Sequence, residues 1–307
     1  MLILAPMQGL TELLFRKVYN DCFPGAFDLA VSPFLSLTHG NLKDALKKVS
    51  DVLPEANVGS IPVVPQILGH EVPEFVELAN RLFELGYSEV NWNIGCPMRR
   101  VAGKHRGSGI LPYPDEVHQV LEGVVPNIRP QLSVKMRLGY NSPDEIFRLI
   151  PILNDYPLKS ITLHPRTGRQ QYSGVPDMES FAKVYPLINH PVIYNGDICS
   201  VADYNRIRTT YPAITDVMIG RGALYNPFLP LQIKQMPCSP QQKAMFVDSL
   251  IQAILARPIP QASKVRKIKE YWCLVSKAFP IAEEQRCKVL HAADLDDMLR
   301  LISDMTK

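Results

Sequence analysis

Short apolar segments rich in β-forming residues recur along the chain, and each is followed by a longer segment with helical spacing. The segment 73–86 shows the helical pattern, since Phe75, Leu78 and Leu82 fall on one face of a helix that Gly86 would end. The apolar segments are 2–7, 27–34, 63–69, 89–95, 133–139, 160–166, 191–197 and 216–222. Eight strands that alternate with helices predict a protein of the α/β class, a (β/α)8 TIM barrel. An open, doubly wound sheet with fewer strands is the alternative.

The pattern changes after residue 235. Residues 236–240 have the composition of a linker, and 241–258, 262–279 and 294–305 have the spacing of helices. We therefore predict two domains, a barrel over residues 1–235 and a small helical domain over residues 241–307.

Composition narrows the class of protein without naming a partner. Of the 307 residues, 46% are hydrophobic and 21% are charged, which is typical of a soluble globular protein with a sizeable core. The net charge of +3 permits a nucleic-acid partner but does not require one. The six cysteines form no C-x-x-C pair, so we expect reduced thiols and no metal site. The start "MLILAPMQG" has no basic region of the kind that opens a signal peptide, and no apolar run approaches the ~20 residues of a membrane span, so we predict a cytoplasmic protein without a signal peptide.

Every predicted strand ends in a cluster of polar, glycine or proline residues. In a barrel the carboxyl ends of all strands lie at one rim, where TIM-barrel enzymes hold their active sites. We therefore expect clusters that are distant in the sequence to gather in one ring. They are Pro6-Met7-Gln8-Gly9, Ser32-Pro33, Gln66, Asn93 with Cys96, Lys135 with Arg137, His164 with Arg166, Asn195-Gly196-Asp197 and Gly220-Arg221-Gly222.

Two parts of this rim suggest an anionic ligand. Lys135 and Arg137 share the strand face toward the barrel interior, where a lysine is costly unless it meets an anion such as a reduced flavin. Gly220 and Arg221, with the segment 195–197, suit a phosphate held after the seventh and eighth strands. Two glycine turns beside a solvated arginine, and an Arg137 that pairs with a loop carboxylate, are the alternatives.

Cys96 lies beside Asn93 at the end of the fourth predicted strand. A thiol with an ordinary pKa of about 8.5 is protonated near neutrality, so it can act as a general acid as well as a nucleophile. The following loop carries Arg99, Arg100 and a glycine-punctuated basic segment, 103–109, which we expect to be mobile and suited to phosphate backbones. The alternative is a Gly-Cys-Pro turn that serves packing alone.

These motifs together resemble those of the tRNA-dihydrouridine synthase family. In chain order they are "APMQG" (5–9), "QILG" (66–69), "NWNIGCPMRRVAGKHRGSGIL" (91–111), "VKMRLG" (134–139), "LHPRT" (163–167), "YNGDI" (194–198) and "MIGRGAL" (218–224). The tail segment "KVRKIKEYW" (264–272) resembles the family's tRNA-binding domain, although a solvated helix face would have the same composition. The chain departs from the family at Pro33, where an acidic residue is common.

The resemblance implies an FMN enzyme that uses NADPH to reduce the C5–C6 double bond of a uridine in the tRNA D-loop. Cys96 would protonate C5 on the face opposite the flavin, and Asn93 would hold the uracil edge. The residues that the resemblance places around FMN are Pro6, Met7, Gln66, Lys135, His164, Asn195, Gly196, Asp197, Gly220 and Arg221. Those that it assigns to the substrate or the tRNA are Asn93, Arg99, Arg100, Arg137, Arg166, Lys264, Arg266 and Lys267.

The tail is similar to that of the bacterial C-type enzymes, which favours uridine 16 as the target. We expect a monomer with tRNA as its partner, and neither DNA nor a membrane. One alternative is an FMN-dependent barrel oxidoreductase that acts on a small pyrimidine or a similar substrate, which would leave the basic tail without a role. Another is a tRNA-binding protein without catalytic activity.

Overall fold

The apolar segments pair as parallel strands of one curled sheet in the computed structural model, which describes residues 1–37, 45 and 49–306. The strands are β1 (Leu2–Leu4), β2 (Leu29–Val31), β3 (Leu35–Ser36), β4 (Val63–Val64), β5 (Gln66–Leu68), β6 (Glu89–Ile94), β7 (Gln131–Gly139), β8 (Ile161–Thr167), β9 (Val192–Tyr194) and β10 (Asp216–Ile219). Their order in the sheet is β3-β5-β6-β7-β8-β9-β10-β1-β2-β4.

Two prolines interrupt strands of the barrel without opening it. Pro33 lies between β2 and β3, and Pro65 lies between β4 and β5; neither residue has an N–H group for a strand ladder. The ladder continues on both sides of the prolines, because β2 pairs with β4 and β3 pairs with β5. Each of the eight predicted segments therefore contains a strand of a closed barrel, and the predicted (β/α)8 fold is confirmed.

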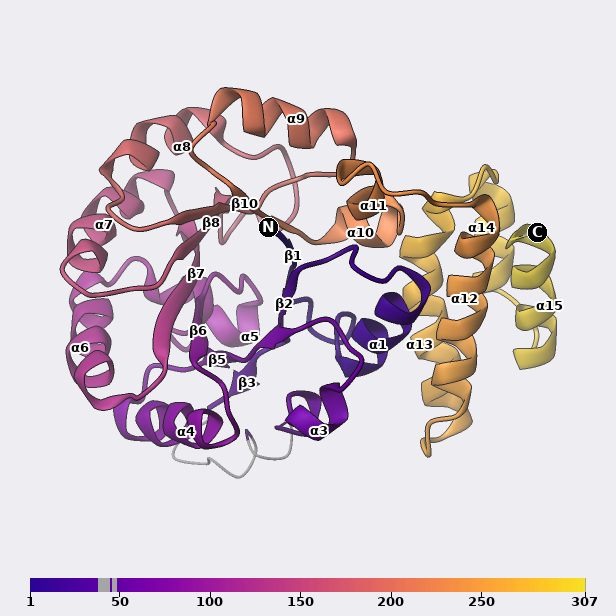
Figure 1. The fold of residues 1–307 in the computed structure, drawn as a ribbon, viewed down its shortest axis with the longest axis horizontal. Helices are drawn as coiled ribbons and strands as arrows, with labels where there is room; N and C mark the ends of the chain where they lie inside the picture. Colours follow the sequence, from indigo (N-terminus) through magenta and orange to yellow (C-terminus); the bar gives the residue numbers. More distant parts are fainter. Residues whose placement is uncertain (38–44, 46–48, 307) are drawn as a thin grey trace.

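Amphipathic helices cover the outside of the barrel (Figure 1). α4 begins at Val72 and ends at Glu84, close to the predicted 73–86, and Gly86 follows it with a φ of 100° that favours glycine. Helices along the barrel portion include α1 (Leu13–Cys22), α3 (Pro54–Asn57), α5 (Arg99–Ala102), α6 (Pro114–Val124), α7 (Ile146–Asn154), α8 (Met178–Val184), α9 (Val201–Thr210), α10 (Arg221–Tyr225) and α11 (Leu229–Ile233). None of the helices in the described part of the chain combines the length and apolar character needed to cross a membrane.

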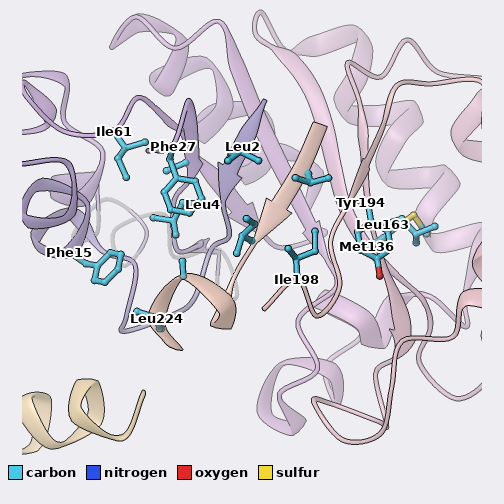
Figure 2. Close-up of a cluster of buried hydrophobic side chains, with 14 of the residues drawn as sticks. Leu2, Leu4, Phe15, Phe27, Ile61, Met136, Leu163, Tyr194, Ile198 and Leu224 are labelled. Carbon is cyan, nitrogen blue, oxygen red and sulfur yellow. The ribbon is translucent and has the colours of Figure 1, made fainter. Parts of the chain in front are cut away.

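The strands bury apolar side chains on both faces, as parallel strands covered by helices do. Leu2 and Leu4 of β1 join the large cluster between sheet and helices, part of which Figure 2 shows. Ile3 and Ala5 alternate with them and form a smaller, separate cluster with Met218 and other residues. The alternation explains why these strands are nearly continuous apolar runs in the sequence.

The C-terminal segment forms helices beside α1 (Figure 1). They are α12 (Pro240–Leu255), α13 (Gln261–Val275), α14 (Glu283–Leu290) and α15 (Leu295–Thr306). Three of them match the predicted helices, whereas α14 was not predicted. Its charged sequence, EEQRCKVL, has no apolar stripe, and Val289 is its buried residue. Packing on α13, including a bond from Trp272 Nε1 to the Arg286 carbonyl oxygen (3.1 Å), holds it instead.

An aromatic cluster joins α12 to the barrel. The ring of Phe246, which is fully buried, lies 5.3–5.9 Å from the rings of Phe15 and Tyr19 on α1 and of Phe23, which follows α1. Aromatic side chains bury large areas and add favourable edge-to-face contacts. The C-terminal helices therefore share a core with the barrel, and the division into domains over residues 1–235 and 241–307 stays a prediction.

Phe246→Ala should lower the free energy of unfolding by about 3–5 kcal/mol, because it leaves a cavity among packed rings. The neighbouring Met245 is 60% exposed, and Met245→Ala should change stability by less than about 0.5 kcal/mol. Urea unfolding followed by circular dichroism measures both. Equal effects of the two substitutions would show that α12 does not depend on the aromatic cluster.

Candidate functional site

The rim at the carboxyl ends of the strands holds a cavity of about 410 Å³. Six of the eight strand-end clusters gather around this cavity as expected, whereas Ser32-Pro33 and Gln66 do not line it. The predicted residues that line the cavity are Pro6, Met7, Asn93, Cys96, Lys135, Arg137, His164, Asn195, Gly196, Asp197, Gly220 and Arg221. Gln66 and Arg166 are fully buried behind its wall, whereas Arg99 and Arg100 are exposed on α5.

A chain of carboxamides supports the wall beside Cys96. Gln66 Nε2 donates to Asn91 Oδ1 (2.8 Å), and Asn93 Nδ2 donates to Gln66 Oε1 (2.7 Å). Asn93 Oδ1 accepts from the backbone N–H groups of Gly95 (3.0 Å) and Cys96 (2.9 Å). The carboxamide of Asn93 thus holds the turn that presents the thiol, and Gln66 holds Asn93.

Close packing accounts for two of the glycines after Cys96. A Cβ on Gly107 would lie 2.6 Å from the Cys96 carbonyl oxygen, and one on Gly109 would lie 2.1 Å from the carbonyl oxygen of Ala102. The amide and hydroxyl of Ser108 also donate to the Cys96 carbonyl oxygen, each at 3.0 Å. Gly107 and Gly109 thus let the backbone of the loop fold closely against the turn that carries Cys96, and the mobility of the loop stays a prediction.

Burial keeps the Cys96 thiol protonated. It raises the pKa of the thiol above its ordinary value, although a hydrogen bond from the Met98 backbone and the charges of Arg137, Lys135 and Arg100 partly oppose the rise. The thiol therefore carries a proton at neutral pH, as a general acid must.

Lys135 and Arg137 extend from β7 toward the cavity, as expected from their two-residue spacing. Burial, and then the charge of Arg137, lower the pKa of Lys135 to about 7; its ammonium has no hydrogen-bond partner among the described residues. Arg137 donates to the carbonyl oxygens of Gly95 (3.0 Å), Thr167 (2.8 Å) and Gln171 (2.7 Å). Backbone carbonyls, rather than the loop carboxylate of the alternative, thus hold its guanidinium.

Asp197 joins two arginines. Its carboxylate accepts two hydrogen bonds from Arg166 (2.9 and 2.5 Å) and one from Arg221 (2.7 Å). Burial alone would raise the pKa of Asp197, but the hydrogen bonds and charges of the two arginines outweigh it and lower that pKa. The backbone of Asp197 has a φ of 33°, a conformation that is uncommon for a residue other than glycine. The carboxylate therefore fixes Arg221 at the cavity and Arg166 behind it.

His164 is held as a neutral ring. Arg166 Nη1 lies 3.1 Å from His164 Nε2, and because a guanidinium can only donate, Nε2 must accept. The proton of the neutral ring then sits on Nδ1. Burial, followed by the charges of Arg137, Lys135 and Arg166, lowers the pKa of His164 well below its ordinary value. The imidazole offers one N–H donor and stays uncharged at neutral pH.

The cavity lining also includes Gln8, Tyr172 and Leu274, for which sequence reasoning predicted no role in cofactor or RNA binding. Gln8 Oε1 is buried without a hydrogen-bond partner, and the ring of Tyr172 lies 5.6 Å from the Arg137 guanidinium and 4.9 Å from that of Arg221. The first two belong to the strand-end segments "APMQG" and "LHPRTGRQQYSG", so their position was a usable signal. Leu274 comes from α13, and nothing in the sequence connects that helix to the rim.

The predicted basic residues of the tail lie on α13. Arg266 is exposed and lines a groove of about 570 Å³ together with Arg257, Lys267 and Lys269. Lys264 Nζ donates to the carbonyl oxygen of Leu255 (2.5 Å), which ties it to the end of α12. Lys267 has partners in the barrel, and its role is taken up below.

The fold and the site define a class: a TIM-barrel enzyme with a cationic cavity at the rim and a protonated thiol in its wall. Two solved structures share the fold, each at a TM-score of 0.55. A histamine dehydrogenase from Rhizobium is 10% identical in sequence, and the match covers 82% of this chain and 48% of that one. A 2-naphthoyl-CoA reductase is 8% identical, and the match covers 75% of this chain and 50% of that one. A family model described as Dihydrouridine synthase (Dus) matches residues 3–287. The chain belongs to the dihydrouridine synthase family, a family of flavin-dependent oxidoreductases.

Curated relatives cover most of the chain. The tRNA-dihydrouridine(16) synthase of Neisseria meningitidis serogroup B is 27% identical over 100% of this chain and 95% of its own length. That of Pseudomonas putida is 32% identical over 75% of this chain and 72% of its own length. The tRNA-dihydrouridine synthase B of Pasteurella multocida is 30% identical over 74% of this chain and 67% of its own length. The resemblance read from the motifs is thus confirmed for the family.

His164 should not titrate between pH 6 and pH 8, because its lowered pKa keeps the neutral form dominant throughout that range. Proton–nitrogen NMR of ¹⁵N-histidine-labelled protein should show its Nδ1 protonated and its Nε2 as an acceptor, with His164→Gln identifying the signal. A signal that titrates with a midpoint near 6.5 would contradict the arrangement with Arg166.

Proposed function

We propose that this dihydrouridine synthase uses NADPH and FMN to reduce the C5–C6 bond of uridine 16 in the D-loop of tRNA. The observation that carries the proposal is that the turn after β6 presents the protonated thiol of Cys96, and β7 presents Lys135, to the same cavity. Reduction of this bond needs a hydride at C6 and a proton at C5, and the cavity has a fixed proton donor.

The residues of the cavity suit FMN. Burial lowers the pKa of Lys135 to about 7, so its amine is only partly protonated near neutral pH, and it has no hydrogen-bond partner among the described residues; the buried Gln8 Oε1 lacks a donor. An anionic ring with N–H groups satisfies both kinds of group. The residues that would hold FMN are Pro6, Met7, Lys135, His164, Asn195, Gly196, Gly220 and Arg221. Gln66 would act through Asn93, and Asp197 would act through Arg221.

The chemistry that FMN supplies when bound is hydride transfer, from NADPH to C6 of the uracil. Cys96 gives its proton to C5, and the thiolate that remains regains a proton from water. The nearby charges of Arg137 and Lys135 favour this brief negative charge. Asn93 keeps the turn of Cys96 in place and has a second Nδ2 hydrogen for the uracil edge.

The RNA approaches from the basic side of the rim. Arg99 and Arg100 are exposed beside Cys96, and Arg266 is exposed on α13, so all three are placed for phosphate contacts. Lys264 is tied to α12 and would contribute charge from there. A uridine must leave its stack to enter the cavity, which costs a few kcal/mol that these contacts offset. The helical region over residues 241–307 would serve as the tRNA-binding domain.

Uridine 16 is the target because the relatives that match along nearly the whole chain carry that specificity in their names. Those of Neisseria meningitidis and Haemophilus ducreyi match 100% and 95% of this chain, respectively. The synthase B of Pasteurella multocida matches 74%. The enzyme would act as a monomer in the cytoplasm, where tRNA is its partner.

The test is reduction of a defined tRNA by the purified protein with FMN and NADPH. Mass mapping of an unmodified transcript should find two added hydrogens at uridine 16, and a transcript with cytidine at that position should stay unchanged. Dihydrouridine at another position would correct the target alone. A protein that reduces free pyrimidines but no tRNA would show the small-molecule alternative to be right.

Cys96→Ala should lower dihydrouridine formation about 10²- to 10⁴-fold, since loss of a positioned general acid has that cost. FMN and tRNA binding should stay near wild type, because Asn93 holds the turn through the Cys96 backbone amide, and among the described residues the thiol itself takes only one hydrogen bond, from the Met98 backbone. Cys238→Ala is the matched control, as this thiol is exposed on the segment before α12. Single-turnover rates measure the effect, and full activity of Cys96→Ala would remove the thiol from the mechanism.

A further inference from the structure

The loop between β1 and α1 forms a large part of the cavity wall. Pro6, Met7, Gln8 and Leu10 line the cavity from this one segment. Its own hydrogen bonds turn it tightly, since the Met7 amide donates to Thr11 Oγ1 (2.8 Å) and the Leu10 amide donates to the Met7 carbonyl oxygen (2.9 Å). These bonds shape the loop but do not tie Gly9 and the carbonyl of Leu10 to the rest of the barrel.

Two side chains of α13 hold that part of the loop. Lys267 Nζ donates to the Gly9 carbonyl oxygen (2.6 Å), and Tyr271 Oη donates to that of Leu10 (2.5 Å). Gly9 has a φ of 80°, a conformation that other residues rarely adopt. A carbonyl that loses its donor in such a partly buried place costs more than an ordinary surface hydrogen bond.

Both side chains are themselves fixed. Lys267 is 20% exposed, and its ammonium also pairs with Glu270 (2.7 Å). Tyr271 is 4% exposed, and its ring stacks on Phe15 with 6.0 Å between ring centroids. A flexible lysine side chain in solvent would lose rotamer entropy when it bonds to a carbonyl oxygen. Lys267 and Tyr271 lose less, because their other contacts already order them.

The same face of α13 reaches the cavity directly. Lys267, Tyr271 and Leu274 have the i, i+4, i+7 spacing of one helix face, and Leu274 lines the cavity. The neighbouring Arg266 lines the groove outside the cavity, and Lys267 lies at the border between that groove and the loop. One helix thus has one face toward the barrel loop and another toward the surface.

We infer that Lys267 and Tyr271 are positioning residues that hold the β1–α1 loop in its cavity-lining conformation, so that the C-terminal helices complete the cofactor pocket. Lys267 would act on the cofactor pocket by holding the Gly9 carbonyl oxygen, and it also lines the surface groove beside Arg266. The inference rests on the proposed function, because FMN is the ligand whose binding it affects.

The experiment measures FMN binding by flavin fluorescence with full-length protein freed of flavin. Lys267→Met and Tyr271→Phe should each weaken FMN binding about 3- to 10-fold, the effect of one lost hydrogen bond. Lys267→Arg keeps a donor and should recover most of the affinity. Lys269→Met is the control, because Lys269 Nζ donates to the carbonyl oxygen of Leu290 (2.6 Å), a bond of the same kind within the C-terminal helices.

Hydrogen exchange of the loop gives a readout that needs no flavin. The Met7 and Leu10 amides should exchange faster in Lys267→Met and Tyr271→Phe than in wild type. In Lys269→Met their exchange rates should equal those of wild type. Unchanged FMN affinity and exchange in the first two variants would overturn the inference, and so would an equal effect of Lys269→Met, which would indicate general loosening of the helices. A wild-type protein that binds no FMN would instead defeat the proposed function, and the exchange data would still decide whether α13 holds the loop.

Discussion

Closure of the parallel sheet is the constraint on which the site depends. Polar groups from six strand ends meet in one cavity only because the sheet continues past Pro33 and Pro65, through the β2–β4 and β3–β5 pairs. A sheet that ended at either proline would have two open edges and no common rim. The short strands next to the prolines therefore matter more for function than their length suggests.

The closed rim brings several cationic side chains close together, and they are accommodated in two ways. Arg137, Arg166 and Arg221 are fixed by backbone carbonyls or by the carboxylate of Asp197, so their charges are in defined positions. Lys135 and His164 respond instead by losing affinity for a proton. The fixed guanidinium groups of Arg137 and Arg221 keep positive charge at the cavity before any ligand arrives, as electrostatic preorganisation requires, and a bound anion would favour the protonated form of Lys135.

The C-terminal helices contact the cavity on one side and carry exposed basic residues on another. Their aromatic contact with α1 joins them to the barrel core, and α13 reaches the cavity through Leu274 and the β1–α1 loop. Exposed Arg266 on the same helix faces away from that contact. In the proposed function, this arrangement would place RNA binding and cofactor binding on one helix, with Lys267 at the border between the two faces.

Much of the fold and the chemistry of the site was determined by the sequence itself. Strand and helix periods are local, so the eight β/α units, three of the C-terminal helices and the rim positions of Cys96 and Lys135 could be predicted. Hydrogen-bond partners were decided by the tertiary structure alone: Asn93 holds the Cys96 turn, Asp197 holds two arginines, and Lys267 reaches Gly9 across 258 positions of the chain. The charged helix α14 likewise depends on packing. The physical reason is that periodicity acts between neighbouring residues, whereas a polar side chain is satisfied by whichever group the closed barrel brings within about 3 Å.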